Sequence, residues 1–178
     1  GDRRPRRAAP GGVAAAPAAP LAARPEVTAP ATQWHSRDLP DVADTESLGR
    51  ELSSGLAAGD VVILDGPLGA GKTALARGIG AGLGVLGRVS SPTFIIAREH
   101  RSGGPGRPGM VHVDAYRLGG LDELDALDLD TDLTDDVVVV EWGEGVAEVL
   151  ADRHLLVRLR RDPDSEVRHA QWGWVYHD

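Results

Sequence analysis

One short run of residues, Gly66–Thr73, combines three glycines, a lysine and a hydroxyl in a fixed spacing. It reads GPLGAGKT and fits the pattern G-x-x-x-x-G-K-[ST] at each fixed position. Glycines let the backbone curl so that its N–H groups point inward, and such a nest in front of a helix binds phosphate oxygens. Lys72 would reach the β- and γ-phosphates of a nucleotide, and the Thr73 hydroxyl would bind Mg²⁺.

The flanking residues predict the secondary structure that such a loop needs. Val61–Leu64 is a short apolar run typical of a buried strand, and Ala74–Arg77 begins a run of helix-forming residues. The plainer alternative is a Gly-rich turn before an ordinary helix. Composition favours phosphate binding, because Lys72 is the only lysine among 19 basic residues. The chain thus uses arginine at every basic position except this one, where the compact ammonium of lysine suits phosphate binding better than the planar guanidinium of arginine.

Two carboxylates follow other predicted strands. Met110–Asp114 reads as a strand that ends in Asp114, and four consecutive valines before Glu141 indicate a strand buried on both faces, as in a parallel sheet. Ligands bind at the carboxyl ends of such strands. Glu141 is therefore placed to hold Mg²⁺ or its water shell, and the alternative is a capping or solvated carboxylate.

Two further polar segments allow more than one interpretation. The hydroxyl-rich turn Ser91–Phe94 would sense a γ-phosphate or Mg²⁺, or it is a plain turn. The acidic stretch Asp122–Asp136 carries leucines on one side, which predicts a short amphipathic helix and a loop. Its acids are interpreted as a solvated face rather than a metal site, and a partner-binding face is the minority alternative.

The remaining pattern predicts one α/β domain behind a tail. Residues 1–31 are rich in Arg, Ala and Pro and cannot bury a core, so we expect a disordered tail and a nucleotide-binding domain over residues 32–178. Further strands are expected at 33–39, 155–159 and 172–176, and a helix is expected from Asp44 with Leu48, Leu52 and Leu56 on one side. The fold expected is a P-loop NTPase-like three-layer α/β fold with a mainly parallel central sheet.

Composition excludes several classes of protein and site. The chain has no cysteine, so disulfides and thiolate metal sites are ruled out, and no apolar run reaches the length of a membrane span. The net charge of −8 is uneven: residues 1–30 hold five Arg against Asp2 and Glu26, which leaves −11 on the remainder. An acidic domain argues against extended contact with nucleic-acid phosphates by this chain alone.

Taken in order, these motifs resemble the bacterial TsaE family, also called YjeE. The resemblance covers about residues 38–160 and is carried by Leu68–Thr73, Ser91–Phe94, His112–Leu118 and the pair Glu141–Trp142. That family is the ATPase component of tRNA threonylcarbamoyladenosine synthesis. The resemblance implies a cytoplasmic ATPase that uses Mg²⁺ and works with the TsaD and TsaB proteins, with tRNA engaged only through the complex and no membrane involved.

The resemblance also implies roles for individual residues. The phosphates of ATP or ADP would be bound by Leu68, Gly69, Ala70, Gly71, Lys72 and Thr73. Thr73 and Glu141 would be Mg²⁺ ligands, and Asp114 would be the acid near the γ-phosphate. Lys72, Asp114 and Glu141 would thus form the catalytic set. Val42 and Thr45, next to Asp41, would lie on the adenine side.

The chain departs from the family pattern at three places. Gly143 stands where the family usually has Pro, and Pro67 stands where it usually has Asp. Residues 163–166, which read PDSE, stand where the family often has Gly-Arg close to the nucleotide.

Two other functions are open from the residues alone. A small-molecule or nucleotide kinase would need an acceptor pocket and an arginine-bearing lid, for which Arg98, Arg101 and Arg107 are the candidates. A nucleotide-gated binding module would bind ATP without hydrolysing it. A GTPase of the common class is disfavoured, because its guanine-reading motif N-K-x-D needs an asparagine and the chain contains none.

Overall fold

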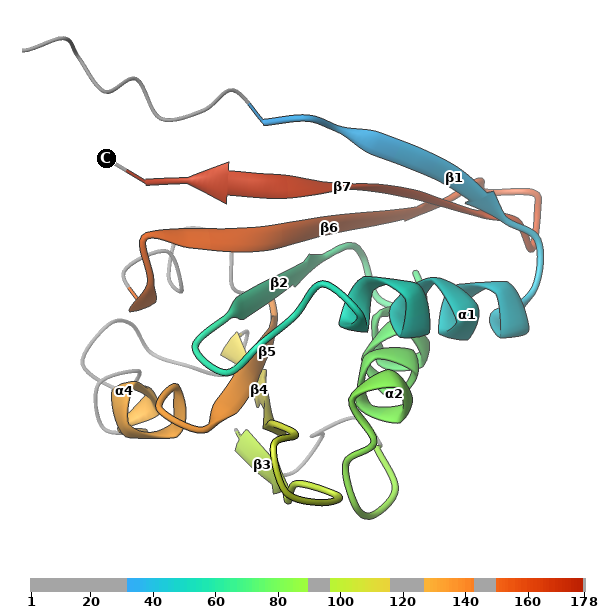
Figure 1. Cartoon of the computed structure of the whole chain (residues 1–178). Coiled ribbons are helices and arrows are strands. Elements are labelled where there is room, and N and C mark those ends of the chain that lie inside the picture. The colour runs from blue at the N-terminus through green and yellow to red at the C-terminus, as the bar shows by residue number, and fades with distance from the viewer. Residues whose placement is uncertain (1–31, 90–96, 116–126, 143–149, 178) are drawn as a thin grey trace, which may run out of the picture.

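The structure is a computed structural model that describes residues 32–89, 97–115, 127–142 and 150–177. These residues form seven strands and three helices, whose arrangement is drawn in Figure 1. In chain order they are β1 (His35–Leu39), α1 (Val42–Ser53), β2 (Val61–Asp65), α2 (Lys72–Leu83), β3 (Ala97–His100), β4 (Gly109–Asp114), α4 (Leu129–Asp132), β5 (Asp136–Glu141), β6 (Arg153–Arg161) and β7 (Arg168–Tyr176).

The described strands form one sheet in the order β1-β7-β6-β2-β5-β4-β3. The four central strands, β6, β2, β5 and β4, are parallel to one another. The outer pairs, β1 with β7, β7 with β6 and β3 with β4, are antiparallel. The predicted α/β class with a parallel centre is therefore confirmed, and the antiparallel pairs lie at the two edges.

Helices cover both faces of the sheet. Helices α1 and α2 pack on one face, whereas α4 lies on the other (Figure 1). The valines of β5 show why that strand is apolar throughout: Val137 and Val139 belong to the core under α1 and α2, and Val138 and Val140 belong to the core on the opposite face. All four are completely buried, as the unbroken valine run predicted.

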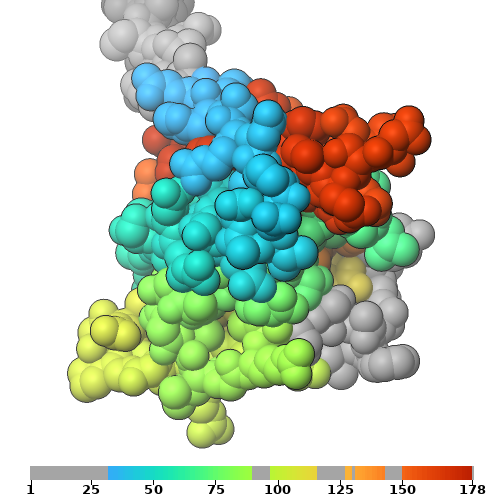
Figure 2. All heavy atoms as spheres, turned by 90° about the vertical axis from the view of Figure 1, so that its right-hand side faces the viewer, coloured from blue at the N-terminus to red at the C-terminus, as the bar shows by residue number. Residues whose placement is uncertain are grey.

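Helix α1 lies directly against α2, as the space-filling view in Figure 2 shows. Glycine makes this approach possible, because a Cβ on Gly78 of α2 would lie 2.1 Å from the Glu46 carbonyl oxygen of α1. An ion pair between Arg77 and Glu46, 2.7 Å long, joins the same two turns. The first half of α1 is thereby held against the middle of α2.

The predicted start of α1 is wrong. Helix α1 begins at Val42 rather than at Asp44, because Asp41 is the extended N-cap residue, with φ of −127°. The Asp44 side chain lies inside the first turn and accepts a hydrogen bond from the Asp41 N–H at 3.0 Å. Leu48 is buried and Leu52 and Leu56 are partly buried, so the predicted apolar side of this helix is confirmed.

Several predictions fall on residues that the structure does not describe. They are the tail 1–31, the Ser91–Phe94 turn, Tyr116 to Leu118, the first five residues (122–126) of the acidic leucine-bearing stretch and Gly143. Of the acidic stretch, α4 and the residues from 127 onward are described. Within the described ranges, no helix has the length and apolar character required to cross a membrane.

Candidate functional site

The loop at residues 66–71, here called the glycine loop, joins the carboxyl end of β2 to the first turn of α2. Gly69 and Gly71 have φ of 79° and 102°, in the left-handed region that glycine adopts without strain. Gly66 is closely packed, since a Cβ there would lie 2.6 Å from the Leu159 carbonyl oxygen. Gly71 is the N-cap of α2 and offers no side chain to cap the first turn, so the helix terminus is suited to an anion.

Lys72 is buried at the base of the glycine loop. Its ammonium donates hydrogen bonds to the carbonyl oxygens of Gly66, at 2.5 Å, and Pro67, at 3.3 Å. Burial lowers the pKa of Lys72, and the carboxylates of Glu141, Asp65 and Asp114 act in the opposite direction. These three acids therefore favour the charged form of the ammonium.

The two predicted acids come together beside the loop. Asp114 and Glu141 are in register at the carboxyl ends of the parallel strands β4 and β5, and Glu141 is also in register with Leu64 of β2. Glu141 is 5% exposed. The alternative of a solvated carboxylate at Glu141 is therefore wrong, since the adjoining strands and helix enclose it.

A histidine that the sequence left without a role contacts this glutamate. His112 Nε2 lies 3.0 Å from Glu141 Oε2, and the His112 side chain is completely buried. Because side chains alternate along a strand, His112 lies on the same face of β4 as Asp114. Its approach to Glu141 depends on how β4 and β5 pair, which the sequence pattern does not give.

The oxygen-bearing residues fit Mg²⁺ better than a metal held wholly by protein. Thr73 is the second residue of α2, so it lies at the same end of the sheet as the carboxylates of Asp114 and Glu141. The described residues hold no group of three or more His, Cys, Asp or Glu arranged for a metal. Mg²⁺ needs no such cage, because it binds through one or two carboxylates together with waters and substrate phosphates.

A hollow of about 210 Å³ adjoins the glycine loop. It is lined by Pro40, Asp41, Val42, Thr45, Gly71, Ala74, Glu166 and Arg168. Val42 is 60% exposed and Thr45 is buried, with its methyl group 3.6 Å from where a Cβ on Gly71 would lie. The two residues assigned to the adenine side thus do lie next to the loop.

Glu166 and Arg168 in this hollow were not predicted. The departure at residues 163–166 left no basis for placing the turn between β6 and β7 near the site. The structure brings it there because β6 and β7 form a hairpin, and β1 runs antiparallel to β7 before entering α1. The pairing itself leaves no local sequence signal, although residues 163–166 correspond to a segment that lies close to the nucleotide in the family that the chain resembles.

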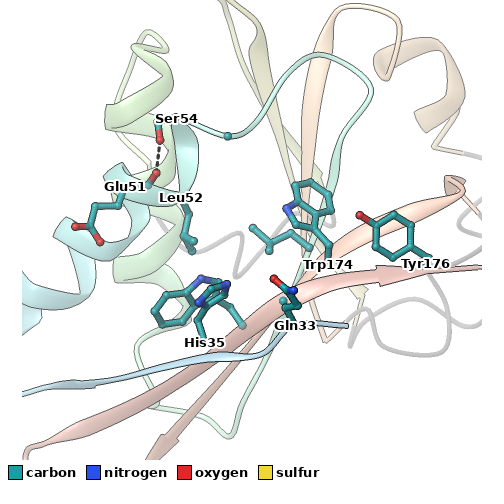
Figure 3. A pocket seen from close by; sticks show the side chains of 11 residues that line it. Gln33, His35, Glu51, Leu52, Ser54, Trp174 and Tyr176 are labelled. Carbon is teal, nitrogen blue, oxygen red and sulfur yellow. Dashed lines mark hydrogen bonds between the residues drawn. The ribbon is translucent and has the colours of Figure 1, made fainter. Parts of the chain in front are cut away.

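A larger hollow, about 420 Å³, lies at the other end of α1 (Figure 3). His35 comes from β1, Trp174 and Tyr176 come from β7, and Glu51 and Ser54 come from the carboxyl-terminal end of α1. His35 stacks on Trp172, with ring centres 5.6 Å apart. A helix of twelve residues spans about 18 Å, so this hollow is remote from the glycine loop.

The arginines proposed for a kinase lid do not gather at the loop. Arg101 and Arg107 lie in the connection from β3 to β4, at the amino end of β4, whereas Asp114 is at its carboxyl end. A different arginine, Arg160 of β6, lies beside the loop: its guanidinium is 3.0 Å from Asp65, the residue that precedes the loop. The geometry therefore gives no support to a lid built from the β3–β4 connection.

Comparison with known proteins gives concordant results. The sequence profile described as "Threonylcarbamoyl adenosine biosynthesis protein TsaE" matches residues 39–170. A protein of Mycobacterium tuberculosis named tRNA threonylcarbamoyladenosine biosynthesis protein TsaE is 56% identical over 157 residues, which cover 85% of this chain and 94% of that protein. A protein of Streptomyces coelicolor with the same name is 60% identical over 127 residues, 69% of this chain and 85% of that protein. The crystal structure of YdiB from Bacillus subtilis covers 80% of this chain and 86% of its own, with a TM-score of 0.62 and 27% identity.

Proposed function

Because the chain belongs to the TsaE family of threonylcarbamoyl adenosine biosynthesis, we propose that it binds and hydrolyses Mg²⁺·ATP in support of the TsaD and TsaB proteins. One observation carries this proposal. The single lysine of the chain, the uncapped start of α2 and two strand-end carboxylates meet at one glycine loop. The cation and the helix terminus suit the phosphates of a nucleotide, and the acids suit the metal ion that accompanies them.

Each residue has a distinct part in the proposed reaction. The backbone N–H groups of residues 68–73 hold the phosphates, and the Lys72 ammonium moves from the carbonyl oxygens of Gly66 and Pro67 to the phosphate oxygens. Thr73 and Glu141 hold Mg²⁺, which when bound neutralises charge that develops on the phosphates. Asp114 lies in register with Glu141 and orients the attacking water.

The hollow beside the loop suits the base. Val42 supplies an exposed apolar surface, and Asp41, Glu166 and Arg168 supply polar groups at its rim. A few polar groups around an apolar floor are typical of a small-ligand site. We therefore assign ATP and ADP as the ligands and Val42 and Thr45 as the adenine-side residues.

The negative charge of the domain bears on whether it contacts tRNA directly or through partner proteins. With −11 outside residues 1–30, the chain is not suited to hold tRNA by itself, so tRNA is engaged through the TsaD–TsaB complex. Slow hydrolysis by the isolated protein is expected, because an ATPase of this size waits for a partner to complete or restrain its site. Binding of ATP then regulates the partner complex, and hydrolysis resets it.

A phosphate-release assay tests this function. The chain is incubated with Mg²⁺·ATP, with and without the TsaD–TsaB pair, and tRNA binding is measured in parallel by filter retention. We expect slow phosphate release alone, clear stimulation by the pair, and no tRNA retention at physiological salt. Fast release that ignores the pair, phosphate transferred to an acceptor, nucleotide binding without any release, or salt-resistant tRNA binding would each contradict the proposal.

A further inference from the structure

The buried histidine next to Glu141 is without an explanation in packing alone. His112 is fully enclosed on the α2 side of β4, where its strand neighbour on that face, Met110, is apolar. Neither ring nitrogen of His112 has a hydrogen-bond partner among the described residues. Burying a polar ring in this way costs free energy, and a residue such as leucine would avoid that cost.

Glu141 is the acid that lies against this ring. His112 is in register with Val139, so Glu141 is its diagonal neighbour on the adjacent strand, two residues further on. The Nε2 to Oε2 separation is 3.0 Å, which is within hydrogen-bonding distance, although the two groups are not aligned as a hydrogen bond in the structure. An ionised carboxylate only accepts, so Nε2 must carry the proton, and this is true of one neutral tautomer and of the charged ring alike.

The backbone of Glu141 is already fixed, whereas its side chain is not. The next N–H, that of Trp142, donates to the Leu64 carbonyl oxygen at 3.1 Å, and the ladder with β4 holds the other side. These bonds set where the Glu141 Cα lies beside the glycine loop. They leave the side-chain torsions of the glutamate to be set by what its carboxylate meets.

We infer that His112 is a positioning residue whose Nε2–H holds one carboxylate oxygen of Glu141, so that the other is presented to the metal and the γ-phosphate. The inference rests on the proposed function, since it assigns how that same site is kept in order. Donors behind a metal-binding carboxylate fix its orientation, and their loss costs about 10- to 100-fold in metal affinity or activity.

Two substitutions at His112 separate positioning from packing. His112→Leu keeps the apolar volume and removes the donor, whereas His112→Gln keeps an N–H at a similar reach and buries an extra polar group. Positioning predicts that turnover falls by about 10- to 100-fold in the Leu variant and is largely restored in the Gln variant. The affinity for ATP should stay within about threefold in both, so that kcat changes and binding does not.

Thermal stability should follow the opposite order. Leucine suits a buried site, so His112→Leu should melt at or above the temperature of His112→Gln. If His112 only fills space, the better-folded Leu variant should also be the more active one. Turnover of His112→Leu equal to or above that of His112→Gln would overturn the inference.

A second measurement does not depend on hydrolysis. Nitrogen-15 spectra of the full chain labelled at histidine report which ring nitrogen carries the proton. We expect a protonated Nε2 on His112 whose proton resonance shifts when Glu141 is replaced by alanine. A bare Nε2, or a resonance that ignores Glu141→Ala, would refute the positioning role even if ATP is hydrolysed. The expected spectra from a protein without ATPase activity would refute the proposed function instead.

Discussion

The ammonium nitrogen of Lys72 lies 3.8 Å from the centre of the Trp142 ring. The lysine belongs to the first turn of α2, and the tryptophan directly follows β5. Trp142 has φ of 60°, a left-handed conformation that a bulky residue rarely adopts, and it is 36% exposed. A cation over an indole face is worth about 0.5–2 kcal/mol. The start of α2 and the end of β5 are therefore in direct contact through these side chains.

This contact predicts that Trp142 reports nucleotide binding. If phosphate draws the Lys72 ammonium away from the ring, the surroundings of the indole change and so does its fluorescence. We expect an emission change on adding Mg²⁺·ADP that disappears in Trp142→Phe. The other three tryptophans lie on or next to β1 and β7, which β6 separates from β2 in the sheet. A change that persists in Trp142→Phe would mean that one of them senses the ligand.

The two acids should affect turnover more than binding. Asp114→Asn and Glu141→Gln remove negative charge from the strand ends without touching the loop backbone. We expect both to bind ATP and to release phosphate about 100-fold more slowly or worse, because they act on metal and water. Glu99→Gln, an exposed acid on the edge strand β3, is the matched control and should behave as wild type. Wild-type phosphate release in both test variants would remove these acids from the site.

Gly78→Ala should destabilise the domain, although alanine is the better helix former. Propensity alone would favour alanine by about 1 kcal/mol, but its Cβ would lie 2.1 Å from the Glu46 carbonyl oxygen. Forcing α1 off α2 should cost about 1–3 kcal/mol net, seen as a lower melting temperature. Gly55→Ala is the control, because a Cβ there meets nothing closer than 3.7 Å. Equal melting temperatures in the two variants would show that α1 moves without cost.

Features of the fold and of the site that depend on residues close together in the sequence could be predicted from the sequence alone. The glycine loop, the valine strand and the apolar side of α1 each follow from a local pattern, namely fixed spacing, an unbroken apolar run or a helical repeat. Asp114 and Glu141 were placed together by a general rule, that carboxyl ends of parallel strands meet. Register was not needed for that inference.

Features that depend on register or on hairpin pairing could not be predicted. His112 meets Glu141 only because β4 and β5 align with Asp114 opposite Glu141, and a shift by two residues would separate them. Glu166 and Arg168 reach Val42 only because the β6–β7 hairpin carries the turn to the start of α1. Neither of these contacts produces a repeating pattern in the amino-acid sequence.

The pairing of the β1 edge predicts a pH effect on stability. His169 on β7 lies 2.6 Å from Asp38 of β1 and 2.9 Å from Asp162, and these carboxylates raise its pKa above the usual 6.5. A raised pKa means that the folded protein holds the proton more tightly. The stabilisation is therefore complete below about pH 6.5 and is lost as the pH rises through the folded-state pKa.

Melting curves of wild type and His169→Gln measure this effect. We expect wild type to be the more stable near pH 5.5, where His169 is charged, and the difference to vanish by about pH 9. The effect should be small and should weaken with salt, because these groups are exposed. A difference that grows with pH would show that the neutral ring is the stabilising form.

Val42 should distinguish binding of the base from binding of the phosphates. It lies in the hollow beside Gly71 and is 60% exposed, so a base resting on it would cover its methyl groups. Val42→Ala removes two of them, at about 0.8 kcal/mol each, and should weaken ATP and ADP by roughly tenfold. Inorganic tripolyphosphate has no base, so its affinity should not change.

Two further variants serve as controls. Lys72→Ala should weaken the binding of all three ligands, because it removes the cation that meets the phosphates. Leu86→Ala, at a similarly exposed apolar residue beyond α2, is the control and should change none of them. Calorimetric titration of each variant with each ligand gives the comparison. If Val42→Ala weakens tripolyphosphate as much as ATP, the substitution has disturbed the glycine loop itself and the base lies elsewhere.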